Sequence, residues 1–243
     1  MHTTFCDGKN SPEQMVLSAI DKGLKTVGVL LHSYLTFTRG GSCKSVESEK
    51  EFAKEINDLK QKYADKIKVL CGIEMDFHSE HKAEGFDYIL GSVHFFEKDG
   101  KYYPIDKSFI DLKYAVDTAF GGDVYSACEQ YFENVSQVVE KHNADIIGHL
   151  DLVTKFNEQN PYIDEKHPRY VTAWKKAVDK LLLTGKPFEI NTGAISRGYR
   201  TTPYPSFDMI DYIKARGGKL IMSSDSHSAE NIRFQYDQWK KLL

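Results

Sequence analysis

The run Thr-Val-Gly-Val-Leu-Leu-His at residues 26–32 is apolar almost throughout and stops at a histidine. A short apolar run rich in branched residues is typical of a buried β-strand. Similar runs occupy residues 67–73, 88–93, 145–147, 188–190 and 219–222. Amphipathic stretches at 12–22, 47–63, 124–141, 168–183 and 206–216 lie between them and predict helices. This alternation predicts an α/β fold with a mainly parallel sheet, either open and doubly wound or closed into a barrel.

The stretch at residues 95–122 has no clear period and is rich in Tyr, Lys and Asp. We interpret it as an excursion from the top of a barrel that helps to cover a substrate. The chain has no internal repeat, low-complexity tract or Pro/Gly/Ser-rich linker. We therefore expect a single domain over residues 1–243.

The composition is that of a soluble globular protein, with 243 residues of which 41% are hydrophobic and 28% charged. The net charge of -3 predicts that nucleic acid is not a partner. Apolar runs fall short of the roughly 18 residues of a membrane span, and residues 1–10 lack the features of a signal peptide. We expect no membrane partner and a cytoplasmic enzyme; the oligomeric state is left open. The four cysteines are scattered and are expected to be free thiols.

Potential metal ligands follow the predicted strands. They are His32, Glu74, His94, His149, Asp225 and His227. In parallel α/β folds, side chains at the carboxyl ends of several strands converge on one site. With His2 and Asp7, the set contains five imidazoles and three carboxylates. These donors suit Zn, Mn or Fe better than Mg or Ca. His78, His81, His142 and His167 lie in polar contexts, and we expect them at the surface.

Several short motifs resemble the signature blocks of the PHP (polymerase and histidinol phosphatase) family. They are His2-Thr3-Thr4-Phe5-Cys6-Asp7-Gly8, Gly72-Ile73-Glu74, Gly91-Ser92-Val93-His94, Gly148-His149 and Ser224-Asp225-Ser226-His227. Within the family, the chain looks most like the monofunctional histidinol-phosphatase branch. The run Glu189-Ile190-Asn191-Thr192-Gly193-Ala194, followed by Arg197-Gly198, is similar to the substrate segment of that branch.

The resemblance implies a distorted TIM-type (β/α)7 barrel that holds three divalent metal ions. The first ion would be bound by His2, Glu74 and Asp225. Glu74 would bridge to a second ion that is also bound by His94 and His149, since a carboxylate has two oxygens for neighbouring cations. The third ion would be bound by Asp7, His32 and His227.

The sequence departs from the family pattern at two places. The family motif begins His-x-His, and His2 matches its second histidine, so the first would fall before Met1. We expect that the sequence starts late and that the first barrel strand is largely truncated. Leu31 precedes His32 where the family usually has an acidic residue, which removes a contact that would support the third ion.

The resemblance further implies hydrolysis of L-histidinol phosphate to L-histidinol and phosphate, a step of histidine biosynthesis, through attack by a metal-bridging hydroxide. Glu74, Asp225 and His227 are the predicted catalytic residues, the last two as proton-handling groups. Arg197 is predicted to hold the phosphate oxygens. The predicted neighbours of the substrate's amine and imidazole are Asp106, Phe95, Tyr103 and Tyr199.

Three alternatives remain open at this point. One is another phosphoesterase of the family, such as a nuclease or a phosphatase acting on sugar or nucleotide phosphates. Another is a metal hydrolase of C–N bonds on a similar barrel, although such enzymes commonly have a carboxylated lysine where this chain has Glu74. The third is a catalytically impaired metal-binding protein.

Overall fold

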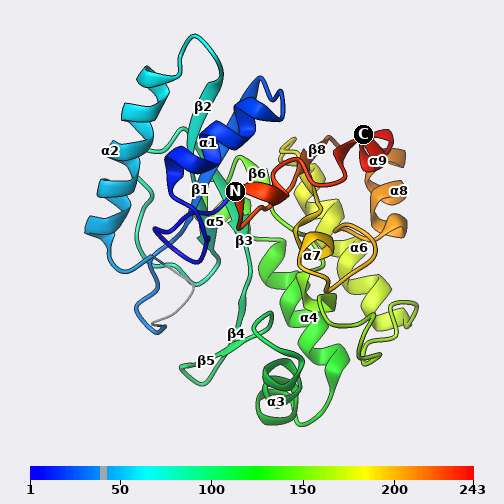
Figure 1. Cartoon of the computed structure of the whole chain (residues 1–243). Helices are drawn as coiled ribbons and strands as arrows, with labels where there is room; N and C mark the ends of the chain where they lie inside the picture. The colour runs from blue at the N-terminus through cyan, green and yellow to red at the C-terminus, as the bar shows by residue number, and fades with distance from the viewer. Residues whose placement is uncertain (39–42) are drawn as a thin grey trace.

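The computed structural model describes residues 1–38 and 43–243. Its main sheet is parallel, in the order β1-β2-β3-β6-β7-β8, and curls into a half-barrel with helices outside it (Figure 1). The strands are β1 (Thr26–His32), β2 (Lys68–Asp76), β3 (Tyr88–Ser92), β6 (Ile146–Ile147), β7 (Phe188–Asn191) and β8 (Leu220–Ser223). Each predicted strand is present with shifted ends, and the predicted distorted TIM-type α/β barrel is confirmed.

The larger helices lie on the outer face of the sheet, with α1 and α2 on one side of the molecule and α4, α6 and α8 on the other (Figure 1). Besides α3 (Phe109–Ala119), which is described below, the α-helices are α1 (Pro12–Asp21), α2 (Val46–Lys62), α4 (Val124–Val135), α5 (Val138–His142), α6 (Pro168–Leu182), α7 (Gly193–Ser196), α8 (Phe207–Ala215) and α9 (Tyr236–Trp239). Ser11 begins α1 with a capping box, because its hydroxyl accepts from the Gln14 amide. No helix in the described part of the chain is long and apolar enough to cross a membrane.

Two hydrophobic clusters hold the sheet from its outer side. Phe52 and Ile56 of α2 are fully buried in the first, against β1 and β2. Tyr131, Phe132 and Tyr170 are buried in the second, where α4 packs on α6. Each such side chain contributes about 1.5–3 kcal/mol through burial. The two clusters hold the strands in their parallel arrangement, so the carboxyl ends of the strands meet at one end of the half-barrel.

The single helix predicted over residues 124–141 is wrong, because the structure divides it into α4 and α5. The Ser136 hydroxyl donates to the Glu133 carbonyl over 2.7 Å, and the Gln137 side chain donates to the same carbonyl over 3.2 Å. Such local side-chain bonds compete with helical backbone bonds and interrupt the helix.

The stretch at residues 95–122 leaves the carboxyl end of β3, as expected of an excursion at the top of the barrel, but its structure is regular. It contains a hairpin of β4 (Phe95–Lys98) and β5 (Lys101–Pro104), followed by α3 (Phe109–Ala119). Asp99 and Gly100 both have positive φ angles, which a two-residue hairpin turn requires. A turn of this kind and one short helix are too brief to produce a clear sequence period.

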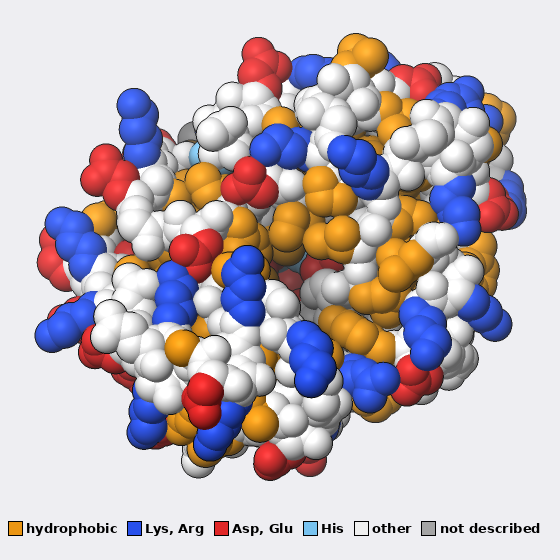
Figure 2. Space-filling view, turned by 90° about the horizontal axis from the view of Figure 1, so that it is seen from above, with side chains coloured by type: hydrophobic (Ala, Val, Ile, Leu, Met, Phe, Trp, Pro, Cys, Tyr) orange, Lys and Arg blue, Asp and Glu red, His pale blue; other side chains and the backbone are white. Residues whose placement is uncertain are grey.

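The two edges of the sheet, β1 and β8, meet at a seam formed by the backbone of residues 1 and 2. The Leu30 amide donates to the Met1 carbonyl over 2.8 Å, and the His2 amide donates to the Ser226 carbonyl over 2.7 Å. A cavity of about 410 Å³ lies beside this seam, toward the amino ends of the strands. Figure 2 shows the hollow on this face surrounded by hydrophobic side chains. The seam thus fixes the backbone of His2 between both sheet edges.

Candidate metal centre

The structure brings together all eight predicted metal ligands at the carboxyl ends of the strands. One group consists of His2, Asp7, His32 and His227, and a second of His32, Glu74 and His94. Within each group, one ligand atom per residue lies within 4.8 Å of the others. His149 and Asp225 join these groups through contacts with Glu74 and His2, respectively.

Glu74 lies at the middle of the cluster and is only 3% exposed. Its Oε2 is 3.2 Å from Nε2 of His2 and 3.6 Å from Nδ1 of His32. Its Oε1 is 3.0 Å from Nε2 of His149 and 3.3 Å from Nε2 of His94. Burial favours a higher pKa, but the surrounding histidines hold the pKa of Glu74 well below its ordinary range. One ionised carboxylate therefore presents one oxygen to each side of the cluster.

His2 is fully buried and stacks between two imidazoles, with ring centroids 4.2 Å from His32 and 4.5 Å from His227. Its Nε2 is 3.2 Å from carboxylate oxygens of both Glu74 and Asp225, yet it makes no hydrogen bond within the described residues. Buried polar atoms without a partner are uncommon. A nitrogen facing two carboxylate oxygens, without hydrogen-bond geometry, is the arrangement that a bound cation would complete.

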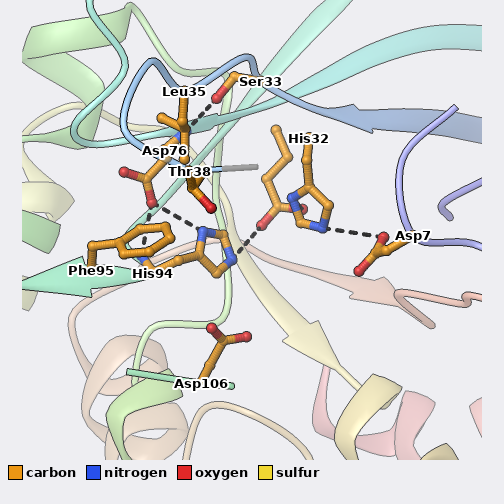
Figure 3. A pocket seen from close by; sticks show the side chains of 10 residues that line it. Asp7, His32, Ser33, Leu35, Thr38, Asp76, His94, Phe95 and Asp106 are labelled. Atoms are coloured by element: carbon orange, nitrogen blue, oxygen red, sulfur yellow. Dashed lines mark hydrogen bonds and ion pairs between the residues drawn. The ribbon is translucent and has the colours of Figure 1, made fainter. Parts of the chain in front are cut away.

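Asp76 is a residue that the sequence analysis missed. Its Oδ2 accepts from the His94 amide over 2.8 Å and from Nδ1 of the His94 ring over 3.1 Å (Figure 3). This bond favours a proton on Nδ1, so that Nε2, which lies 3.3 Å from Oε1 of Glu74, is the nitrogen left to bind a metal. A sequence signal existed, because Asp76 and Glu74 are two residues apart on one strand and share a face.

The third predicted group is looser. Oδ1 of Asp7 is 3.7 Å from Nε2 of His32 and 3.3 Å from Nε2 of His227. Burial, and then the proximity of His2, lower the pKa of His32 to about 4. The His32 imidazole is therefore neutral near pH 7, which is the form that binds a metal. Gly8 closes the loop behind this group, because a Cβ there would lie 2.5 Å from the His2 carbonyl.

Arg197 lies against two of the predicted ligands. Its NH2 group donates to Oδ2 of Asp225 over 3.1 Å, and its NH1 group lies 2.5 Å from Nδ1 of His227. Asp225 has a φ of 40°, and a Cβ at Gly193 would lie 2.8 Å from Asp225 Oδ2. Only glycine therefore fits at position 193, where the predicted substrate segment passes the site.

The cavity in front of these groups has a volume of about 300 Å³. Lys155, Lys9 and Tyr199 line it together with Arg197 and the ligands. Lys155 was missed in the sequence because it comes from no motif. Its ammonium donates to the Asp106 carbonyl over 2.7 Å and lies 4.9 Å from the centre of the Tyr199 ring. Together with the partly buried Arg197, the largely buried Lys155 gives the cavity two cations.

Of the four predicted neighbours of the organic group, three line the site. Asp106 and Phe95 line a smaller cavity of about 110 Å³ beside His94, and Figure 3 shows the Asp106 carboxylate pointing toward His94. Tyr103 lines neither cavity; it is partly buried against the core, with its ring 6.3 Å from that of Tyr114. Side chains alternate along β5, so Tyr103 faces α3.

The four histidines expected at the surface are half-buried and have partners. His81 lies 2.9 Å from both carboxylate oxygens of Glu49, and His142 lies 3.3 Å from the Phe77 carbonyl. His78 lies 3.1 Å from the Phe95 carbonyl, and the ring of His167 stacks on that of Tyr125. These contacts give them structural roles outside the ligand groups.

Fold and ligand cluster together define a metal-binding α/β barrel protein, and comparison with known proteins places it in a family. A PHP domain model matches residues 1–193, and the chain belongs to the PHP domain family. The predicted membership is thereby confirmed.

Individual relatives agree with this result. A histidinol-phosphatase of Bacillus subtilis is 25% identical over 260 residues, covering 98% of this chain and 95% of the relative. The solved histidinol phosphate phosphatase of Lactococcus lactis, complexed with zinc, L-histidinol and phosphate, is 25% identical with a TM-score of 0.74, covering 100% of this chain and 90% of that one. A candidate histidinol phosphatase of Listeria monocytogenes shares the fold with a TM-score of 0.84 at 21% identity. The match covers 98% of this chain and 97% of that one.

Proposed function

We propose that this protein is a metal-dependent phosphomonoesterase that hydrolyses L-histidinol phosphate to L-histidinol and phosphate. The observation that carries the proposal is Glu74, whose two oxygens face two different sets of imidazoles at the strand ends. The names of the relatives and the zinc, L-histidinol and phosphate held by the Lactococcus lactis structure support the same substrate.

The donor set fits divalent cations. In this proposal, up to three ions of Zn, Mn or Fe are bound, in the sets given by the family resemblance. The buried, unpartnered Nε2 of His2 and the fixed tautomer of His94 are the features of this chain that favour it. Bound cations would neutralise the phosphate dianion and lower the pKa of a water molecule toward 7.

The chain's own residues divide the remaining work. Arg197 offers the phosphate oxygens the N–H donors that do not bond Asp225 and His227, and Lys155, which lines the same cavity, adds a second cation. When the bond between phosphorus and the ester oxygen breaks, that oxygen takes up a proton to give L-histidinol. His227 and Asp225 are the groups beside Arg197 that can hold or transfer this proton.

The organic part of the substrate carries an amine and an imidazole. Asp106 supplies a carboxylate at the junction of the two cavities, and the Phe95 ring forms a flat apolar wall beside it. A carboxylate attracts the ammonium group, and an aromatic face accepts a cation or a second ring. We therefore place the phosphate toward Arg197 and the amino alcohol toward Asp106.

The experiment is phosphate release from histidinol phosphate by the purified chain with added Mn or Zn. A chelated sample and a panel of sugar and nucleotide phosphates are run in parallel. Turnover that chelation removes and that favours histidinol phosphate supports the proposal. Equal or better turnover of a sugar or nucleotide phosphate would reassign the substrate, and turnover unaffected by chelation would remove the metals from the mechanism. A cytoplasmic location and the absence of a nucleic-acid partner stay predictions.

A further inference from the structure

Two segments beyond the strand ends carry the groups that surround the larger cavity. Residues 149–159 carry His149 and Lys155, and residues 197–206 carry Arg197 and Tyr199. Several hydrogen bonds join the two segments. Among them are Gln159 Nε2 to the Gly198 carbonyl at 2.6 Å, the Thr201 amide to Glu158 at 2.7 Å and the Ser206 amide to Asp151 Oδ2 at 3.0 Å.

Arg200 lies at the centre of this junction and is only 7% exposed. Its NH1 group donates to the Thr154 hydroxyl over 2.6 Å and lies 3.9 Å from Oδ2 of the fully buried Asp151. Its guanidinium lies 4.5 Å from the centre of the Tyr204 ring. The Tyr204 ring in turn lies edge-on to the His149 ring, with centroids 6.3 Å apart. One buried arginine therefore touches both segments and the aromatic neighbour of a predicted metal ligand.

Stability alone does not account for this cluster. Buried ion pairs add little to stability compared with apolar residues of the same volume. Moreover, Arg200 Nε, Asp151 Oδ1 and Tyr204 Oη have no hydrogen-bond partner within the described residues, so the network is only partly satisfied. What the guanidinium does fix is geometry, because its planar fork allows few placements of the Thr154 hydroxyl and the Asp151 carboxylate.

We propose that Arg200 is a positioning residue that sets the spacing between the segment bearing His149 and Lys155 and the segment bearing Arg197. Its bond to Thr154 aligns the metal-binding side of the cavity with the guanidinium that receives the phosphate. The inference rests on the proposed function, because alignment matters only if both sides act on one substrate. Misplacement of such groups by about 1 Å lowers catalytic rates by about 100-fold.

Thr154→Val is the principal test, because it removes the hydroxyl at almost the same volume, and Thr154→Ser restores the hydroxyl. Arg200→Lys keeps the charge but loses the fork. We would measure kcat and KM with histidinol phosphate at saturating Mn, the affinities for Mn and for inorganic phosphate, and Tm. The expected result for Thr154→Val and Arg200→Lys is a fall in kcat of about 10- to 100-fold and weaker phosphate binding. Thr154→Ser should return both values close to those of the unmodified chain.

Arg169→Lys is the matched control. Arg169 bonds Asp123 and Glu129 at the protein surface and lines neither cavity of the site, so its replacement should leave kcat unchanged. A lower Tm for Thr154→Val with unchanged kcat and phosphate affinity would overturn the proposal. If Arg200→Lys does not fold, Thr154→Val and Thr154→Ser still decide the question. If the unmodified chain fails to hydrolyse histidinol phosphate, the proposed function fails, whereas the phosphate affinities still test the positioning role.

Discussion

Replacing Glu74 with glutamine tests the centre of the site at nearly constant volume. The substitution exchanges a charged oxygen for an NH2 group that faces imidazole nitrogens. Glu74 touches His2 on one side and His149 on the other. Removing a residue that merely hydrogen-bonds a metal ligand, without touching the metal, weakens metal binding by about 10- to 100-fold. Since Glu74 contacts both sides, the combined weakening should reach about 10²- to 10⁴-fold, equivalent to about 3–5.5 kcal/mol.

The assay combines the metal content of the purified protein with kcat/KM for histidinol phosphate. We expect Glu74→Gln to lose bound metal on both sides of the cluster and at least about 10³-fold of kcat/KM. Glu49→Gln is the control, because Glu49 is also a buried carboxylate bonded to a histidine, His81, but lies outside the ligand groups. A Glu74→Gln protein that keeps its metal and most of its turnover would refute the bridging role.

Three further outcomes are expected. Arg197→Lys should lower kcat/KM for histidinol phosphate by about 100-fold and weaken inhibition by phosphate in parallel, because an ammonium cannot present two parallel donors. Unchanged inhibition by phosphate would exclude a role of Arg197 in holding the phosphate. Hydrogen bonding to Glu49 raises the pKa of His81, so its stabilisation is complete below about pH 6.5 and is lost as pH rises through the raised pKa. His81→Gln should therefore lower the free energy of unfolding by about 1 kcal/mol at about pH 5.5 and by less at about pH 9, seen as a larger fall in Tm at the lower pH; an equal loss at both values would contradict this. Chelation should lower Tm, because metal at about 100 times its Kd adds about 2.7 kcal/mol of stability; a Tm that is unchanged after complete metal removal would show that the ions do not support the fold.

The strands were predictable because their signal is local. Each is a short apolar run, and a histidine or carboxylate lies at or just beyond the end of most of them, as His32 does for β1 and His94 for β3. The site followed from the strands, because parallel topology places every carboxyl end on the same side. The convergence of residues as distant as His32 and His227 therefore required no knowledge of the helices.

What could not be predicted depends on contacts between distant segments. Lys155 belongs to no motif and enters the cavity only because Asp106, on another segment, holds its ammonium. Tyr103 has the chemistry of a substrate neighbour, but the pleat of β5 turns it toward α3. The break after α4 depends on two side-chain bonds to one carbonyl, that of Glu133, which a helical pattern does not reveal.

The position of the site relative to the sheet explains why its geometry depends on the whole half-barrel. Glu74 comes from β2, Asp225 follows β8, and His2 lies on the seam between the two sheet edges. A carboxylate from β2 and one from the segment after β8 therefore meet around one imidazole, each 3.2 Å from its Nε2. Any change in the curl of the sheet alters the separation of these oxygens directly. Cation binding at this point would couple the closure of the sheet to the geometry that the reaction requires, because both depend on the same few side chains.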